Sequence, residues 1–176
     1  MNRDTVLINV SIPTPANAGP DTAFCFSNLS HQLTGTPAGT WINPSWLNAN
    51  GTFISDTVGT FNAIYAVGGG SCLVYDTAHV TIHPLPVVHA GLDQQLCAAD
   101  PCFNLAAPSP LGGAWSGPGI ANTASGQFCA ATANNGVNQI LYTYQNPTTT
   151  CSNTDTLLVT IVPMPVPGVA INPLFC

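Results

Sequence analysis

The chain has 176 residues, enough for one or two domains, and its 45% hydrophobic content allows folded cores despite 16 Gly and 16 Pro. It carries one Arg and no Lys against seven acidic residues, for a formal net charge of −6. This balance argues against proteins that bind nucleic acid or anionic membranes, because both need a basic surface. No stretch is long enough to span a membrane, and we expect any export signal to lie outside this sequence.

The first segment, residues 1–15, reads MNRDTVLINVSIPTP. It runs from an Asp-Thr pair through alternating apolar residues into Pro-x-Pro, and residues 71–86 and 151–165 do the same. The pattern predicts the last strand of a preceding repeat, over residues 4–12, followed by a linker. A strand without a sheet of its own is expected to belong to a longer array or to complete a neighbour's sheet.

Residues 16–86 and 87–165 are predicted to be two copies of one repeat. Each opens with Ala-Gly, reaches a first cysteine, then a Trp and a Gly-x-Phe, and ends with a second cysteine before the final strand. The first cysteines, Cys25 and Cys97, are 72 residues apart. Residues 166–176 are predicted to be a linker and the start of a following repeat, because Cys176 follows Pro-x-Pro at the same spacing as Cys97.

The strands of each repeat are recognisable from alternation over residues 61–67 and 138–144. No helical periodicity is found, and Gly, Pro and Asn separate the short apolar runs. The Cys…Trp…Cys order predicts an all-β fold of tandem immunoglobulin-like sandwiches joined by short, stiff Pro-x-Pro linkers. The residues expected to face the cores are Phe61, Ala63, Tyr65 and Val67, and Ile140, Tyr142 and Tyr144.

Three elements carry a resemblance to a known family: AGPD…C and AGLD…C, LTGTP-AGTW and PLGGAWSGPG, and C-x3-DT before a strand ending in Pro-x-Pro. In these the chain resembles the tandem PKD-like and Ig-like repeats of large Bacteroidetes-type surface adhesins and gliding-motility proteins exported by type IX secretion. The resemblance covers nearly all of the chain and implies an extracellular or cell-surface location. The Trp-Asp-Phe-Gly-Asp-Gly element of true PKD domains is absent.

The seven cysteines indicate an oxidising compartment. The alternative, a metal or redox site, lacks a C-x2-C motif and any zinc-type spacing, so neither metal nor cofactor is expected. The repeat phase predicts disulfides between Cys25 and Cys72, Cys97 and Cys151, and Cys102 and Cys129, with Cys176 lacking a partner within this chain.

Five of the seven aspartates precede a threonine and an apolar residue. The family resemblance implies that these triplets accept O-glycans. The alternative is that repeat ancestry duplicated the triplet and that the Asp is only a turn acceptor at the start of a strand. The acids are too scattered to favour calcium. The candidate glycosylated residues are Thr5, Thr22, Thr57, Thr77 and Thr156.

Catalysis has little support, because no carboxylate pair or nucleophile–base motif is present. Trp41 and Trp115 are expected in the cores, whereas Trp46 has no counterpart and either covers a loop or stacks on a sugar. We expect a non-enzymatic structural segment of an extracellular fibre or adhesin stalk, whose partners are other copies or neighbouring repeats. The alternatives are a carbohydrate-binding or adhesive module and an accessory region of a large secreted enzyme.

Overall fold

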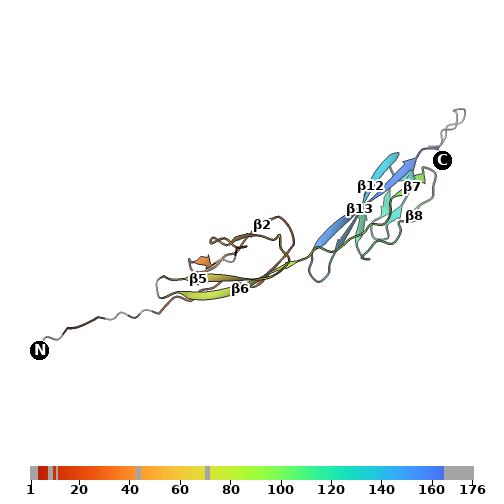
Figure 1. The fold of residues 1–176 in the computed structure, drawn as a ribbon. Coiled ribbons are helices and arrows are strands. Elements are labelled where there is room, and N and C mark those ends of the chain that lie inside the picture. The colour runs from red at the N-terminus through yellow and green to blue at the C-terminus, as the bar shows by residue number, and fades with distance from the viewer. Residues whose placement is uncertain (1–3, 8–9, 11, 43–44, 70–71, 165–176) are drawn as a thin grey trace. The chain divides into compact units, whose positions relative to one another are not determined.

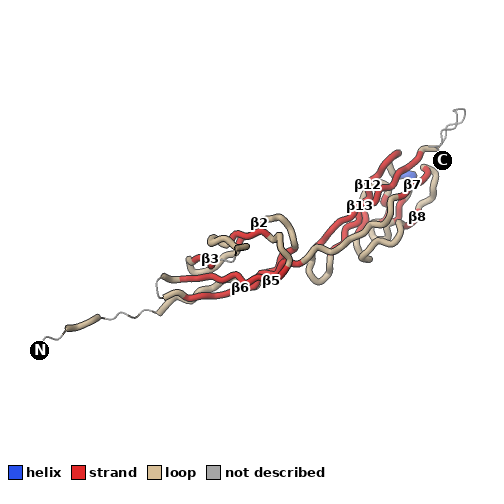
Figure 2. Tube along the Cα trace, viewed as in Figure 1, coloured by secondary structure: helices blue, strands red, loops and turns tan. Residues whose placement is uncertain are grey.

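A computed structural model describes residues 4–7, 10, 12–42, 45–69 and 72–164. The chain divides into two compact units, Met1–Pro84 and Leu85–Cys176. Strands dominate both units (Figure 2). Among the described residues, the one helical element is a 3-10 turn at Ala130–Thr132 in the second unit.

The first unit is built on a four-stranded sheet with the order β1-β6-β5-β3. The long strands β5 and β6 form an antiparallel hairpin (Figure 1), whereas β1 runs parallel to β6. The short antiparallel pair β2-β4 supplies the second sheet. The strands are β1 Thr22–Cys25, β2 Ser30–Gln32, β3 Thr40–Ile42, β4 Thr52–Ile54, β5 Gly59–Val67 and β6 Val74–His83.

The second unit repeats this arrangement. Its four-stranded sheet has the order β7-β13-β12-β9, again with a parallel first strand, and faces the smaller sheet β10-β11-β8. The strands are β7 Gln94–Cys97, β8 Phe103–Asn104, β9 Ala114–Ser116, β10 Ile120–Asn122, β11 Gln127–Phe128, β12 Gly136–Gln145 and β13 Ser152–Val162. The predicted all-β, immunoglobulin-like fold is therefore confirmed.

Each unit has its own hydrophobic core between the two sheets. The alternation predicted for residues 61–67 is confirmed, since Ala63, Tyr65 and Val67 are buried and Phe61 is partly buried against the core. In β12, Ile140 and Tyr142 are buried in the same way, and Tyr144 packs at the core margin. The long strands β5 and β12 thus each supply a face whose apolar side chains are removed from water.

The Gly-x-Phe motif of each repeat has a packing explanation. A Cβ on Gly126 would lie 2.6 Å from Trp115 Nε1, and one on Gly51 would lie 2.6 Å from Trp41 Nε1. Both glycines have positive φ, which other residues seldom adopt. The Phe two positions later is fully buried in each unit. The glycine therefore lets the backbone pack directly against the buried tryptophan, and the phenylalanine fills the core beside it.

The part of the opening segment that the structure describes shows no strand. Its described residues, 4–7, 10 and 12, are outside any strand. The apolar side chains of Val6, Leu7, Val10 and Ile12 are exposed. No strand of the described residues pairs with this segment, which leaves its alternating pattern without a sheet. Its assignment to a preceding repeat stays a prediction, and residues 166–176, the expected start of a following repeat, lie outside the described residues.

Candidate functional site

The cysteine pairing is partly as predicted. Cys102 and Cys129 form a disulfide with an S–S distance of 2.03 Å. They flank β8 and β11, whose register pairs Phe103 with Phe128 and so sets the two cysteines opposite each other. This bond closes one end of the small sheet of the second unit.

The predicted Cys25–Cys72 disulfide is wrong. Cys72 is a free, exposed thiol, whereas Cys25 is disulfide-bonded. The register sets Cys25 opposite His83, at the far end of β6 from Cys72. Eleven residues of extended chain separate those ends, about 35 Å at strand spacing, while a disulfide needs Cα atoms within about 7 Å. The parallel pairing of β1 with β6 is the physical reason.

The predicted Cys97–Cys151 disulfide is wrong for the same reason. Both cysteines are disulfide-bonded. However, β7 pairs Cys97 with Val162, and Cys151 precedes the opposite end of β13, again about 35 Å away at strand spacing. Each unit therefore carries one cysteine at either end of its long sheet rather than a bond across its core.

We call the end where the chain enters a unit its leading end, and the end where it leaves its trailing end. Cys72 and Cys151 lie at the leading ends, in the hairpins that precede β6 and β13. Cys25 and Cys97 lie at the trailing ends, beside the last residues of those strands. The cysteines thus mark the two ends of each sandwich.

The repeated aspartates hold the leading ends together. Asp76 Oδ2 accepts a hydrogen bond from the Ala18 N–H at 2.7 Å, and Asp155 Oδ2 accepts one from the Ala90 N–H at 2.8 Å. Both carboxylates therefore fasten the incoming chain to the last strand. The bond from Ala90 and a second from the Thr156 N–H lower the pKa of Asp155, with the nearby His89 contributing less; burial opposes this shift.

A second pair of aspartates fastens the next stretch of chain. Asp21 Oδ1 accepts a hydrogen bond from the His79 N–H at 2.8 Å, and Asp93 Oδ1 accepts one from the Leu158 N–H at 2.9 Å. The repeated aspartates thus accept hydrogen bonds from backbone N–H groups in or beside strands. This role is close to the alternative in which the Asp, duplicated with the repeat, is an acceptor at the start of a strand. Asp56 is different, because its carboxylate accepts a hydrogen bond from the adjacent Thr57 hydroxyl and from no other described residue.

The candidate glycosylation sites differ in access. The Thr22 hydroxyl is buried without a hydrogen-bond partner, so the folded unit has no room for a glycan there. The remaining candidates are exposed: Thr5, Thr57, Thr77 and Thr156. Thr77 and Thr156 lie within long strands, whereas Thr57 lies in the loop between β4 and β5. Thr5 and Thr57 are thus the exposed candidates that lie outside the strands.

A Ser–His contact that sequence reasoning missed lies in the first unit. Ser55 Oγ lies 3.2 Å from His31 Nε2 and 2.8 Å from Ser27 Oγ. Ser55 is fully buried, and the His31 ring packs against Phe24 and Phe53. A nucleophile must reach its substrate, so this cluster serves as an internal hydrogen-bond network that satisfies a buried hydroxyl.

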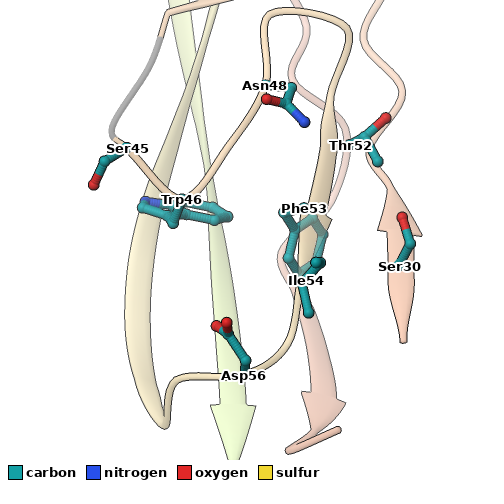
Figure 3. Close-up of a pocket in the computed structure, with 8 residues that line it drawn as sticks. All are labelled: Ser30, Ser45, Trp46, Asn48, Thr52, Phe53, Ile54 and Asp56. Carbon is teal, nitrogen blue, oxygen red and sulfur yellow. The ribbon is translucent and has the colours of Figure 1, made fainter. Parts of the chain in front are cut away.

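Trp46 borders a pocket of about 330 Å³ in the first unit (Figure 3). Its ring packs on Phe53 and Phe61, with centroids 5.5 Å and 5.2 Å apart. The other walls come from β4 and from the loops before and after it, including Asn48 and Asp56. Trp41 and Trp115 are buried as predicted, and each packs on the tyrosine that its neighbouring long strand sets opposite it.

Within the described residues, no three His, Cys, Asp or Glu side chains come together as metal ligands. The same part of the chain holds no helix of the length and apolarity needed to cross a membrane.

The chain matches no protein-family model and no curated protein. Among solved structures it is similar to a SusE-like surface-located polysaccharide-binding protein of Bacteroides thetaiotaomicron, with 12% identity, a TM-score of 0.43 and coverage of 81% of this chain and 33% of that one. Drosophila N-cadherin EC1-3 shows 8% identity and a TM-score of 0.35 over 86% of this chain and 69% of that one. Human protocadherin-24 EC1-2 shows 12% identity and a TM-score of 0.28 over 82% and 95%. The chain spans about a third of the first of these proteins.

Proposed function

We propose that this chain is a non-enzymatic structural segment of an extracellular fibre or cell-surface stalk, whose repeats join end to end. The disulfides support an extracytoplasmic location, since such bonds persist in oxidising compartments. The units are sandwiches whose repeated polar residues serve the fold rather than a reaction centre. A fibre needs reach and resistance to unfolding, and both follow from stiff linkers and cross-linked sheets.

The observation that carries the proposal is the distribution of cysteines at the ends of the units. Cys151 is disulfide-bonded although Cys97 is out of reach and Cys102 and Cys129 bond to each other. Its counterpart Cys72 occupies the same leading-end position with an exposed thiol. We infer that a leading-end cysteine is built to bond outside its own sandwich, and that Cys72 takes the trailing-end cysteine of a repeat placed before it.

The chemistry of this joint is a thiol oxidation. Two thiols become one disulfide and release two protons and two electrons, which the disulfide of a thiol–disulfide oxidoreductase accepts as it becomes a dithiol. An exposed thiol in a hairpin is open to this exchange. In a tandem chain both thiols belong to one polypeptide, so the bond forms within one molecule and the effective concentration of the partner thiol is high.

A tandem protein tests the joint directly. Residues 1–12 are replaced with a copy of residues 16–83, so that the added repeat leads into Pro13 as His83 leads into Pro84. The added copy carries the change Cys72→Ser, so that the native Cys72 is the one leading-end thiol of the two copies of the first unit. After oxidation with a glutathione buffer, non-reducing peptide mapping is expected to find Cys72 bonded to the Cys25 of the added copy. Changing only that added cysteine to Ser should restore alkylation of Cys72. A Cys72 that stays reactive in the fully oxidised tandem protein would overturn the proposal.

The proposal extends to covalent O-glycans at the exposed Asp-Thr sites, with Thr57 first. Asp56 has no fastening role in the fold, whereas Asp21, Asp76 and Asp155 do, so the fold does not account for Asp56. Intact mass of protein isolated from its native host, compared with the 18.1 kDa of the polypeptide, tests this point for the segment. A chymotryptic peptide between Phe53 and Phe61 that carries Thr57 without a glycan in that material would rule out this site.

A further inference from the structure

The pocket beside Trp46 lies where the first unit departs from the repeat. The register pairs Leu47 with Phe53 in the first unit and Ile120 with Phe128 in the second, so Trp46 takes the position of Gly119. Both positions pack on the buried Phe, since a Cβ on Gly119 would lie 2.6 Å from the Phe128 ring. The sandwich is therefore complete without a tryptophan at this place.

The opposite wall of the pocket departs as well. The pairing of β2 with β4 sets Ser30 opposite Ile54, the positions that Cys102 and Cys129 occupy in the second unit. Where the second unit has a disulfide, the first has a hydroxyl and a half-exposed isoleucine, and both line the pocket (Figure 3). The first unit thus has Trp46, Ser30 and Ile54 where the second has a glycine and a disulfide, and these three residues line the pocket.

The pocket offers an aromatic wall with hydrogen-bonding groups around it. Trp46 is held by Phe53 and Phe61. Figure 3 shows the Asp56 carboxylate directed toward the Trp46 side, with Asn48 beyond the ring. Among the described residues, no side-chain hydrogen bond engages Ser30, Ser45 or Asn48, and Asp56 bonds only the Thr57 hydroxyl. These groups are thus free to bind a ligand.

We propose that this pocket binds a neutral saccharide, with a sugar ring stacked on Trp46 and its hydroxyls hydrogen-bonded by Asp56, Asn48 and the nearby serines. An indole face takes the apolar C–H side of a sugar, while carboxylate and amide groups exchange hydrogen bonds with hydroxyls. The volume lies at the lower end of the range for small-molecule sites, about 300–1,000 Å³.

The charge of the pocket and the number of aromatic rings that it exposes disfavour anionic and quaternary ammonium ligands. A carboxylate in the pocket and a net charge of −6 disfavour an anion. A quaternary ammonium ligand is usually held by an aromatic cage, but Phe53 is only 2% exposed, so Trp46 alone presents a ring face. The proposal goes beyond a stalk, because it gives the first unit a binding activity that the second lacks.

The test uses the full chain and neutral oligosaccharides of gluco-, manno- and xylo-configuration, with binding measured by calorimetry and by shielding of tryptophan fluorescence from acrylamide. Trp41 and Trp115 are buried, so the shielding reports on Trp46. We expect saturable binding in at least one series. Trp46→Gly, which installs the residue of the second unit, should weaken it by about tenfold or more.

Two further variants keep the outcome interpretable. Asp56→Asn should weaken binding without loss of folding, because Asp56 is exposed and bonds only its neighbour. The control, Leu111→Ala at an exposed site of the second unit, should bind as the unaltered chain does. The proposal fails if none of the three series binds, if Trp46→Gly and Asp56→Asn bind normally, or if only heparin or a quaternary ammonium compound binds. None of these results bears on the disulfide test of end-to-end assembly.

Discussion

At the residue scale, Asp155 shows how one carboxylate fastens a whole segment. Its Oδ2 accepts the Ala90 N–H, and its lowered pKa records that the charged form is the one bound. A carboxylate that accepts backbone donors contributes more than a neutral acceptor does. The incoming chain and the last strand are therefore joined by an interaction that depends on ionisation.

Asp155→Ala is expected to lower the free energy of unfolding by about 1–3 kcal/mol at pH 7, because a donor loses its partner. The folded-state pKa lies below the usual 3.8, so the stability from ionised Asp155 is present above that value and is lost as pH falls through the folded pKa. Urea titrations of both proteins from pH 7 to pH 2 should therefore converge in acid. Asp4→Asn, at an exposed residue, is the control. A constant gap down to pH 2 would contradict this role.

Glycine at position 126 is required by two separable effects. Its φ of 69° disfavours a side chain, and a Cβ would meet Trp115 at 2.6 Å. Gly112 also has a positive φ, 92°, but a Cβ there would meet nothing within 4 Å. Gly112→Ala therefore measures the backbone cost alone, about 1 kcal/mol. Gly126→Ala should cost more, by about 1–3 kcal/mol, because the contact displaces a core indole. Thermal unfolding of both variants tests this, and equal losses would refute the packing account.

At the scale of elements, the Cys102–Cys129 disulfide stabilises the smallest strands of the second unit. The strands β8 and β11 have two residues each, too few to pair stably alone. The bond closes a loop with a sequence separation of 27, which is worth about 3.5 kcal/mol in the chain-entropy model. The first unit forms the corresponding pair with longer strands, β2 and β4.

The double change Cys102→Ser and Cys129→Ser should therefore lower the unfolding free energy by about 3 kcal/mol. Cys72→Ser is the matched control, because that thiol is exposed and free and its loss should be nearly neutral. Guanidinium denaturation followed by circular dichroism measures both. A double variant as stable as the control would show that strand pairing, not the cross-link, holds this sheet.

The same elements show what sequence could and could not give. The long strands β5 and β12 were predictable, because their alternation of buried and exposed residues is dictated by the sheet. The short strands β2, β4, β8 and β11 were not, since two or three residues carry no period. The predicted partners of Cys25 and Cys97 were wrong because the sequence does not show that β1 and β7 run parallel to the last strand of their unit. This parallel pairing places Cys25 and Cys97 at the trailing ends.

The candidate sites divide in a similar way. Trp46 was singled out because the second repeat lacks it, and repeat comparison is a real signal. Its pocket was not predictable, because it depends on Ser30 and Ile54 facing each other where the second unit has a disulfide. The hydrogen bonds of Asp76 and Asp155 link residues about 60 positions apart, so only the folded register reveals them.

At the scale of the whole molecule, charge decides how the protein behaves in acid. The chain has a sequence pI near 4.4, where net charge and mutual repulsion vanish. Asp155 is still largely ionised at that pH because its pKa is lowered, so the second unit should remain folded when the charge is zero. Solubility and stability should therefore fail at different pH values.

We accordingly expect a solubility minimum near pH 4.4, with precipitate that redissolves as native protein at pH 7, and unfolding only at lower pH. Light scattering and circular dichroism across one pH series separate the two events. Precipitation depends on charge repulsion between molecules, whereas unfolding depends on the Asp155 hydrogen bond within one molecule. The two events should therefore occur at different pH values. If scattering and loss of structure coincide at pH 4.4, acid sensitivity lies in the fold itself, and the carboxylates that fasten the leading ends are weaker than their geometry implies.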